Sequence, residues 1–166
     1  WGTHLTMGQF AGGTGAQPFK TEKDYTNFLK RMDKYAVWID SAMVYMKKGM
    51  AKGVVLPKSL TVKLIPQFAE MATPNIEDNL FYSAIKLLPA SFPESIKEDL
   101  TAKYTATINT KLIPQYKKMA DFLNKEYLPA SRATSGIGSL PFGKELYATY
   151  VKQWTTTEMT PEQIHE

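Results

Sequence analysis

The chain has 166 residues, 43% of them hydrophobic and 22% charged, and its formal net charge at pH 7 is +4. These proportions are typical of a folded domain with its own core. No apolar run approaches the roughly 18 residues that a membrane-spanning helix needs. Cysteine is absent, which excludes a disulfide framework, a thiolate nucleophile and a cysteine-based zinc site.

The basic balance does not predict nucleic-acid binding. Arg31 and Arg132 are the only arginines among 20 basic residues, and arginine dominates base-edge and bidentate phosphate recognition. The lysines are interleaved with acidic residues along the chain, a pattern typical of solvated helix faces.

Residues 1–20 are predicted to be irregular because they contain five of the ten glycines and few periodic apolar positions. The cluster GGTG lacks the Gly-Lys-Ser/Thr of a phosphate-binding loop. It also has Pro18 where the dinucleotide-binding pattern needs a third glycine. A turned connector is therefore the expected structure.

A long helix is predicted to begin after Thr21, whose side chain suits the N-cap position. Apolar residues then recur at three- and four-residue steps as far as Met46, and Gly49 and Gly53 provide a stop. Trp38 and Tyr45 lie off this stripe, which predicts neighbours on more than one side of the helix.

A second helix is expected from Pro57, with Pro66 kinking it or ending it. Short segments follow between 73 and 92, and a further long helix runs from Pro93 to about Leu128 with a bend at Pro114. KLIPQFAEMA (63–72) and KLIPQYKKMA (111–120) are similar, but their flanks are not. We therefore favour chance and similar helix packing over a true repeat.

Residues 129–143, PASRATSGIGSLPFG, are predicted to form a Gly/Pro-rich loop. A helix follows from Lys144 to about Trp154. Thr160, Pro161 and Gln163 then form the start signal of another helix, of which only a first turn remains. No alternating strand pattern appears. The fold class is thus mostly α, an antiparallel bundle of long, partly kinked helices joined by Gly/Pro-rich loops.

The severed helix start, and Trp1 in place of an initiating methionine, suggest either a single helical domain or a fragment of a larger helical protein. No catalytic residues are predicted, because His4 and His165 lie at opposite ends of the chain without a supporting motif. His165-Glu166 is half of a His-Glu-x-x-His zinc motif, but any such pair would look the same. We therefore expect no metal site here.

Four stretches carry a resemblance to a known family: QPFKTEKDYTNFLKRM (17–32), MKKGMAKGVVLPKSL (46–60), LIPQYKKMADFLNKEYLPASR (112–132) and GIGSLPFGKELYATYVKQWTTTEMTPEQIHE (136–166). They resemble, in order, the bacterial family known as domain of unknown function 885. The last stretch is the most specific, with its Gly-rich loop, Leu-Pro-x-Gly, tyrosine-bearing helix and Thr-Pro-Glu-x-Ile-His-Glu.

The resemblance implies a helical, zinc-dependent peptidase-like parent of several hundred residues, with a periplasmic, cell-envelope or secreted location. The family's presumed metal motif lies downstream of the matched region. The resemblance therefore implies a fragment without cofactor, whose partner is the rest of the parent chain and which contributes scaffold and one wall of a peptide-substrate cleft. Zinc would belong to the full-length parent.

Within that cleft the resemblance directs attention to Arg132, Tyr147, Gly136 and Gly138 as substrate-binding residues. Glycines let a ligand approach the backbone closely, and Arg132 borders the loop. In the alternative interpretation Arg132 caps a helix end and Tyr147 belongs to the core.

Two further expectations concern surfaces. An apolar patch near Leu146, Val151 and Trp154 would be exposed without the parent's remaining residues, and would be available for a dimer contact. The alternative function is a stand-alone helical binding module, whose basic surface meets an acidic partner or an anionic membrane.

Overall fold

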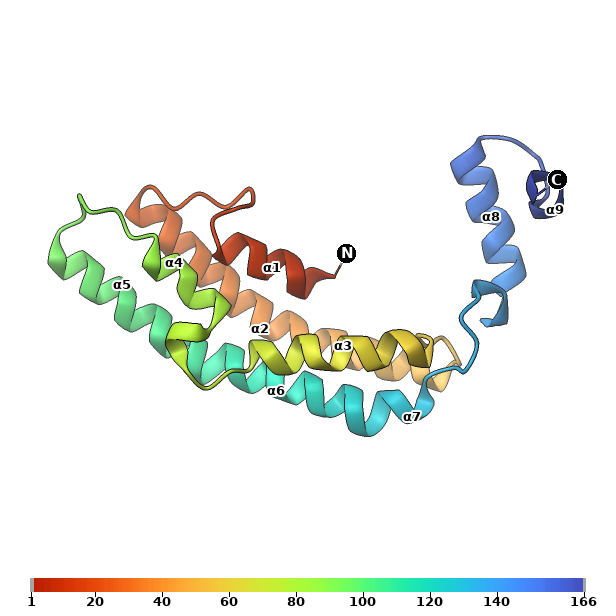
Figure 1. Cartoon of the computed structure of the whole chain (residues 1–166), viewed down its shortest axis with the longest axis horizontal. Coiled ribbons are helices and arrows are strands. Elements are labelled where there is room, and N and C mark those ends of the chain that lie inside the picture. Colours follow the sequence, from red (N-terminus) through yellow and green to blue (C-terminus); the bar gives the residue numbers. More distant parts are fainter. Residues whose placement is uncertain (1, 166) are drawn as a thin grey trace.

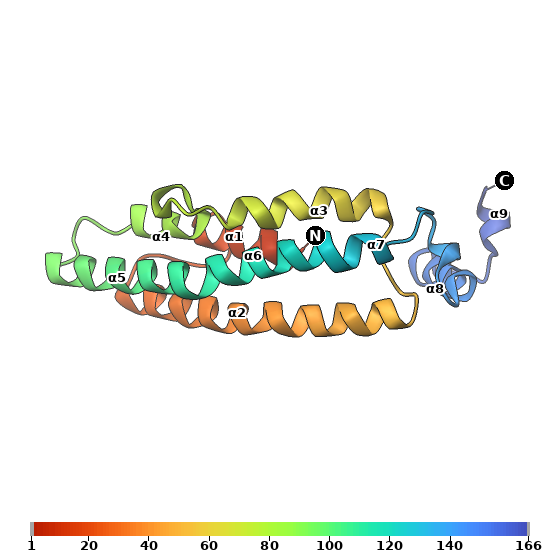
Figure 2. The ribbon, with the colours of Figure 1, turned by 90° about the horizontal axis from the view of Figure 1, so that it is seen from below.

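The computed structural model describes residues 2–165 and the side chains of residues 2–164. The body is built from three long helical rods: α2 (Glu22–Ala51), α3 (Lys58–Met71) and a continuous run, α5 to α7, from Glu94 to Ala130 (Figures 1 and 2). No β-strand occurs in the described residues; Pro57 and Arg132 form an isolated bridge. The mostly α bundle predicted from the sequence is confirmed.

The rods are joined and flanked by shorter elements. In chain order these are α1 (Thr3–Ala11), η1 (Ile76–Asp78), η2 (Leu80–Tyr82), α4 (Ser83–Lys86), η5 (Ile137–Ser139), α8 (Gly143–Thr155) and α9 (Pro161–His165). The third rod comprises α5 (Glu94–Thr107), a π turn η3 (Ile108–Leu112), α6 (Ile113–Phe122), a second π turn η4 (Leu123–Tyr127) and α7 (Leu128–Ala130).

The first twenty residues correct the sequence prediction. Only the part after Ala11 is irregular, because Thr3–Ala11 form α1. Met7 and Ala11, one helical turn apart, are buried in the core. Gly8 lies so close to Leu80 that a Cβ there would be only 2.5 Å from a leucine methyl group. The glycines that argued against a helix thus include one that allows close packing of the helix, and tertiary contact overrides the weak local propensity.

The start of α2 agrees with the sequence prediction. The Thr21 hydroxyl accepts a hydrogen bond from the Asp24 amide at 3.3 Å, and the Asp24 carboxylate accepts one from the Thr21 amide at 2.8 Å. This reciprocal capping box satisfies two amides that the helix itself leaves free. The helix ends at Ala51, and Gly53 (φ 70°) takes the left-handed conformation in the turn that follows.

α2 and the third rod run parallel to each other. Salt bridges join Asp33 to Lys111 (2.7 Å), Asp40 to Lys118 (2.6 Å) and Lys47 to Glu126 (2.7 Å), so both helices advance together. The predicted antiparallel arrangement holds for α3, which returns the chain from the end of α2 and packs against α6 (Figures 1 and 2).

The two similar segments, 63–72 and 111–120, pack against each other. Phe68 and Tyr116 occupy the same position within each segment, and their ring centroids lie 5.7 Å apart. Near one end of this antiparallel pair, the Thr61 and Ser131 hydroxyls hydrogen-bond at 2.8 Å. The similarity therefore coincides with a mutual helix–helix contact.

Prolines shape the third rod without ending it. Pro114 and Pro129 each follow a π turn. Proline lacks an N–H and collides with the carbonyl four residues earlier, and a wider turn relieves both problems. The bend predicted at Pro114 is thus a π turn within a continuous helix. In α3 the helix continues through Pro66 to Met71, so the boundary considered there is absent.

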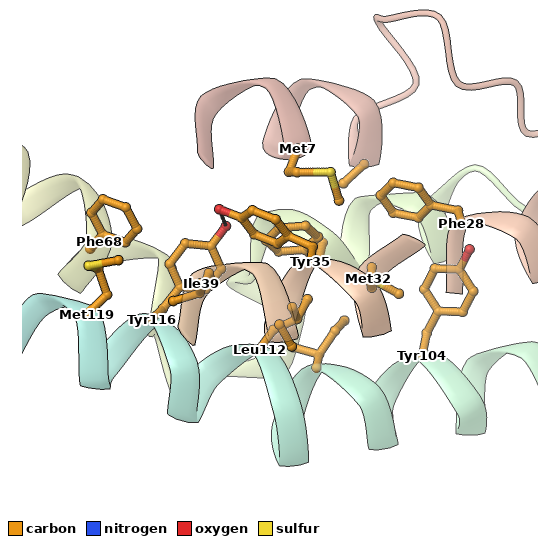
Figure 3. Packing of buried hydrophobic residues seen from close by; sticks show 14 of the residues in the cluster. Met7, Phe28, Met32, Tyr35, Ile39, Phe68, Tyr104, Leu112, Tyr116 and Met119 are labelled. Carbon is orange, nitrogen blue, oxygen red and sulfur yellow. Dashed lines mark hydrogen bonds between the residues drawn. The ribbon is translucent and has the colours of Figure 1, made fainter. Parts of the chain in front are cut away.

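The core is rich in aromatic side chains, which extend along the space between the rods (Figure 3). Tyr104 donates its hydroxyl to the Tyr25 carbonyl at 2.9 Å, and Tyr25 donates to the Leu87 carbonyl at 2.8 Å. Tyr116 donates to the Tyr35 hydroxyl at 3.3 Å. Each of these buried phenols therefore has a hydrogen-bonding partner, as burial requires.

Trp38 and Tyr45 are themselves exposed, at 45% and 69%. α2 nevertheless contacts α1 as well as the third rod, since the Arg31 guanidinium lies 5.0 Å from the Phe10 ring centroid. Separately, no described helix is both long and apolar enough to cross a membrane.

Candidate ligand-binding groove

α8 and α9 lie beyond the end of the bundle (Figure 1). Together with η5 they line a groove. Its volume is about 880 Å³. The lining comes from three short stretches of chain: Gly136, Ile137 and Gly138; Lys144, Tyr147 and Ala148; Pro161 and Glu162. The structure thus brings together three of the four residues predicted to bind substrate, Gly136, Gly138 and Tyr147.

Gly136 and Gly138 present backbone without a side chain to the groove, on either side of Ile137, which also lines it. A Cβ built on Gly136 or Gly138 would have no neighbour within 4 Å. Gly136 is extended, with φ −69° and ψ 147°, so its backbone conformation does not itself require glycine. What the two glycines provide is access, because an incoming group can reach the main chain there.

Gly143 has a different role. A Cβ on Gly143 would overlap the Ile137 carbonyl oxygen and approach Gly138 to within 2.9 Å. Glycine here lets η5 lie directly against the first turn of α8. The preceding residue, Phe142, adopts a left-handed conformation (φ 57°) with its side chain 81% exposed, a backbone geometry that costs on the order of 1 kcal/mol outside glycine.

Arg132 holds the loop below the groove and does not line it. Its Nη1 donates to the carbonyls of Thr134 (2.7 Å) and Gly136 (2.6 Å) and to the Ser139 hydroxyl (2.8 Å). Its Nε donates to the Val55 carbonyl at 3.1 Å, between α2 and α3. Arg132 therefore links the loop that carries Gly136 to the bundle, because one side chain hydrogen-bonds both the Gly136 carbonyl and the Val55 carbonyl. It does not cap a helix end.

Tyr147 supplies the aromatic wall and is 39% exposed, so it is not a core residue. Lys144 lies one turn earlier on the same helix, and Glu162 faces the groove from α9. The lining therefore combines a cation, an anion, an aromatic ring and open backbone.

The position of α9 depends on local hydrogen bonds that the sequence predicted. The Gln163 side chain accepts from the Thr160 amide at 2.8 Å, and the Thr160 hydroxyl accepts from the Gln163 amide at 3.3 Å. The reversal that places α9 beside α8 begins at Thr156, whose φ of 57° is left-handed.

Sequence reasoning missed Lys144, Ala148, Pro161, Glu162 and Ile137. A signal existed for Lys144, which lies three residues before Tyr147 on one helix face, and for Ala148, which lies four residues after Lys144. None existed for Pro161 and Glu162, because their place depends on the reversal at Thr156.

The described residues do not fit a zinc ion. No group of three or more histidine, cysteine, aspartate or glutamate side chains among them could hold a metal. His4 is 7% exposed, stacks on Phe68 at 4.5 Å between ring centroids, and hydrogen-bonds Gln67 at 2.8 Å, so it has a packing role. His165-Glu166, the half-motif at which no metal site was expected, lies outside the described side chains.

The apolar patch expected around α8 is present in part. Trp154 is 81% exposed, whereas Leu146 and Val151 are half-buried. Phe142, Tyr150 and Met159 add exposed apolar surface close by in the chain. A dimer contact through this patch stays a prediction.

A second hollow, of about 770 Å³, lies between α2 and α6. Met43 and Phe122 are apolar parts of its lining. The charged residues around it are largely paired, as in Lys118–Asp40 and Lys125–Asp121 (3.5 Å), so it offers fewer free groups than the groove at α8.

Comparison with known proteins identifies a family whose function is unknown. The chain matches no curated protein and no solved structure with significance. Residues 2–166 match the family described as bacterial protein of unknown function (DUF885). The chain therefore belongs to the DUF885 family of bacterial proteins.

Proposed function

We propose that this chain is the helical scaffold and one wall of the substrate cleft in a metallopeptidase-like hydrolase, and that the groove at α8 binds a peptide. The observation that carries the proposal is that Gly136 and Gly138 line the same groove as Tyr147, and that neither glycine has a neighbour within 4 Å of where a side chain would begin. Main-chain groups of a peptide can approach the backbone closely at these glycines, and the aromatic ring offers packing for one of its side chains.

The charges of the groove fit the same ligand. Lys144 can meet a peptide carboxylate and Glu162 an amine or basic side chain, because both line the groove. Binding and orienting are the tasks of these residues. Zinc would be held by residues outside this chain, in the rest of the parent protein, and we place that parent in the cell envelope or periplasm.

The test uses fluorescein-labelled casein peptides and fluorescence polarisation with the 166-residue chain. We expect saturable binding that Gly138→Leu weakens at least tenfold, because the leucine fills open space without a clash. Gly12→Leu is the matched control, since a Cβ there meets only ordinary contacts at 3.6 Å or more, far from the groove. Equal binding by wild type and Gly138→Leu would contradict the proposal.

The full-length parent provides the second readout. Its zinc content should be unaffected by Gly138→Leu, while KM for peptide hydrolysis rises and kcat changes less. A parent that carries no zinc, or hydrolyses no peptide, would refute the hydrolase assignment even where the groove binds peptides.

A binding module with a basic surface is the second candidate, and one observation favours it. The basic residues are not uniformly paired, because all the charged residues on one exposed face of α2 are cations.

A further inference from the structure

α2 has one continuous solvent-facing stripe of unusual composition. Exposed residues recur along it at steps of three or four, which keeps them on one face of a helix. We call this set the α2 outer stripe; its members are Lys23, Asn27, Lys30, Arg31, Lys34, Val37, Trp38, Ser41, Tyr45 and Lys48. Lys52 extends it just beyond the helix end.

The α2 outer stripe contains no carboxylate. The acidic residues of α2 are used elsewhere: Asp24 in the capping box, Asp33 with Lys111, and Asp40 with Lys118. Glu22, in the first turn, is separated from Asp33 by steps of three or four residues, so it lies on the face of α2 that carries Asp33 and not on the stripe. Within the described residues, no lysine of the stripe forms a salt bridge.

The neighbouring helix does not cancel this positive charge. Along the edge that α2 shares with the third rod, the carboxylates Asp33, Asp40 and Glu126 each face a lysine at 2.6–2.7 Å. That edge is therefore close to neutral, with Lys117 as a further cation on α6. An anionic partner would approach the stripe without meeting an unpaired carboxylate from this edge.

Aromatic side chains occupy the middle of the stripe. Trp38 is 45% exposed and is held by stacking on Tyr35, at 5.6 Å between ring centroids. Tyr45 is 69% exposed, with the Lys48 ammonium 4.9 Å from its ring centroid. Val37 adds an exposed aliphatic side chain beside Trp38. Tryptophan and tyrosine flanked by lysine is the combination that membrane–water interfaces favour.

We propose that the α2 outer stripe docks this protein on an anionic membrane surface, with lysines at the lipid phosphates and Trp38 and Tyr45 at the level of the headgroups. The stripe suits such a surface because a 30-residue helix presents about 45 Å of continuous edge. Lysine attracts phosphate as a point charge, whereas nucleic-acid readers depend on arginine, of which the stripe has one.

An acidic protein fits less well. Protein partners anchor on residues seated in pockets. Lys34 and Val37 border a smaller hollow of about 470 Å³ between α2 and the third rod, but neither Trp38 nor Tyr45 lines it or the hollow at Met43 and Phe122. The membrane surface is also independent of the groove at α8, so either proposal can fail without the other.

The test measures flotation with vesicles of phosphatidylcholine containing 40% phosphatidylglycerol, against vesicles of phosphatidylcholine alone. We expect binding only to the anionic vesicles at 50 mM NaCl, and at least a tenfold loss at 500 mM. A lysine near an anionic surface contributes about fivefold in affinity. Lys34→Glu with Lys48→Glu should therefore weaken binding by roughly 25-fold or more.

The matched control is Lys58→Glu with Lys63→Glu on α3, which changes net charge equally at two exposed lysines outside the stripe. It should retain most of the binding. Trp38 gives a second readout: in a Trp1→Phe, Trp154→Phe background it is the one remaining tryptophan, and its emission should shift to the blue on anionic vesicles.

Three outcomes would overturn the proposal. Equal loss in both double variants would show that net charge alone drives adsorption. Vesicle binding without a change in Trp38 emission would place the contact elsewhere. Binding to polyglutamate or DNA with no binding to vesicles would assign the stripe to an acidic protein or to nucleic acid, and binding to none of these would leave it without an anionic partner.

Discussion

Neighbouring glycines in the 136–143 segment differ in what they contribute. Gly136 and Gly138 have open space where a side chain would stand, and Gly143 has none. The sequence shows three glycines in one loop but not which of them is under steric constraint. That difference appears only when η5 is seen against the first turn of α8.

Gly143→Ala should therefore destabilise the attachment of α8, because its Cβ would overlap the Ile137 carbonyl. Overpacking of this kind costs about 1–3 kcal/mol. Gly138→Ala should be close to neutral. Hydrogen exchange of the α8 amides, measured for both variants, should show faster exchange in Gly143→Ala only. Equal exchange rates would contradict the steric account.

Arg132→Lys should loosen the 132–139 loop as much as Arg132→Met. Arg132 donates to five acceptors in a spread that a single ammonium cannot reach. With each hydrogen bond worth about 0.5–1.5 kcal/mol net, the loss predicts roughly tenfold faster exchange at the Ser139 and Leu140 amides. Retention of protection in the lysine variant would show that charge alone suffices.

At the scale of elements, the sequence predicted helix starts correctly where local hydrogen bonds, and not tertiary contacts, determine them. Thr21 and Thr160 cap their helices as predicted. α1 was not predicted because Gly8 lowers helix propensity, whereas burial of Met7 and Ala11 and the close approach of Leu80 stabilise the helix in the fold. Trp38 and Tyr45 are exposed although they suggested contacts with neighbours, because an apolar side chain off the main stripe can be exposed as well as buried.

The candidate site could be predicted from the sequence only in part, because its residues meet through tertiary arrangement. Tyr147 and the loop glycines were identified as residues, but their meeting with Glu162 depends on the chain reversal at Thr156. Arg132 was correctly singled out as unusual. Its role in holding the loop could not be read from sequence, because its acceptors are main-chain carbonyls, which every residue has.

The contact between α2 and α6 predicts that the stability of the folded state falls in acid. The hydrogen bond from Lys118, with a smaller contribution from Gln115, lowers the pKa of Asp40 below its ordinary value of 3.8. Because the pKa of Asp40 is lower in the folded state, the ionised carboxylate stabilises the folded state at pH values above the ordinary pKa. This stabilisation disappears as the pH falls through the folded-state pKa.

Asp40→Asn should therefore reduce the loss of stability between pH 5 and pH 3, measured as the urea midpoint of helix unfolding. The pair is partly exposed, so the difference should be within about 1 kcal/mol. Asp99→Asn is the control, since its partner Lys103 lies on the same helix (2.6 Å). If Asp40→Asn and wild type lose stability in parallel, the pair contributes nothing across the interface.

At the scale of the whole molecule, the aromatic core predicts the behaviour in alkali. Burial raises the pKa of Tyr25 to about 12 and that of Tyr35 to about 12, and raises the pKa of Tyr104 and Tyr116 further. The folded state therefore favours the neutral phenols. Its stability is complete below pH 10 and declines as the pH rises from 10 through 12.

Helix unfolding and tyrosinate absorbance should accordingly rise together above pH 10. Tyr116→Phe should move the midpoint to higher pH, because it removes one ionisable group from the centre of the core, provided that the variant keeps its neutral-pH stability within about 1–2 kcal/mol. Full tyrosine ionisation before helix loss would contradict this picture of a closed core.

The parallel course of α2 and the third rod also determines where charge accumulates along the long axis. Two helices that begin at the same end add their macrodipoles instead of cancelling them, and the single return helix α3 offsets about one of these two macrodipoles. Charged side chains oppose the macrodipole that remains. Glu22, Asp24 and Glu94 lie at the amino ends of α2 and α5, and Lys48 lies in the last turn of α2. The molecule is thus polarised end to end by its topology, and its terminal turns carry the counter-charges that keep that polarity small.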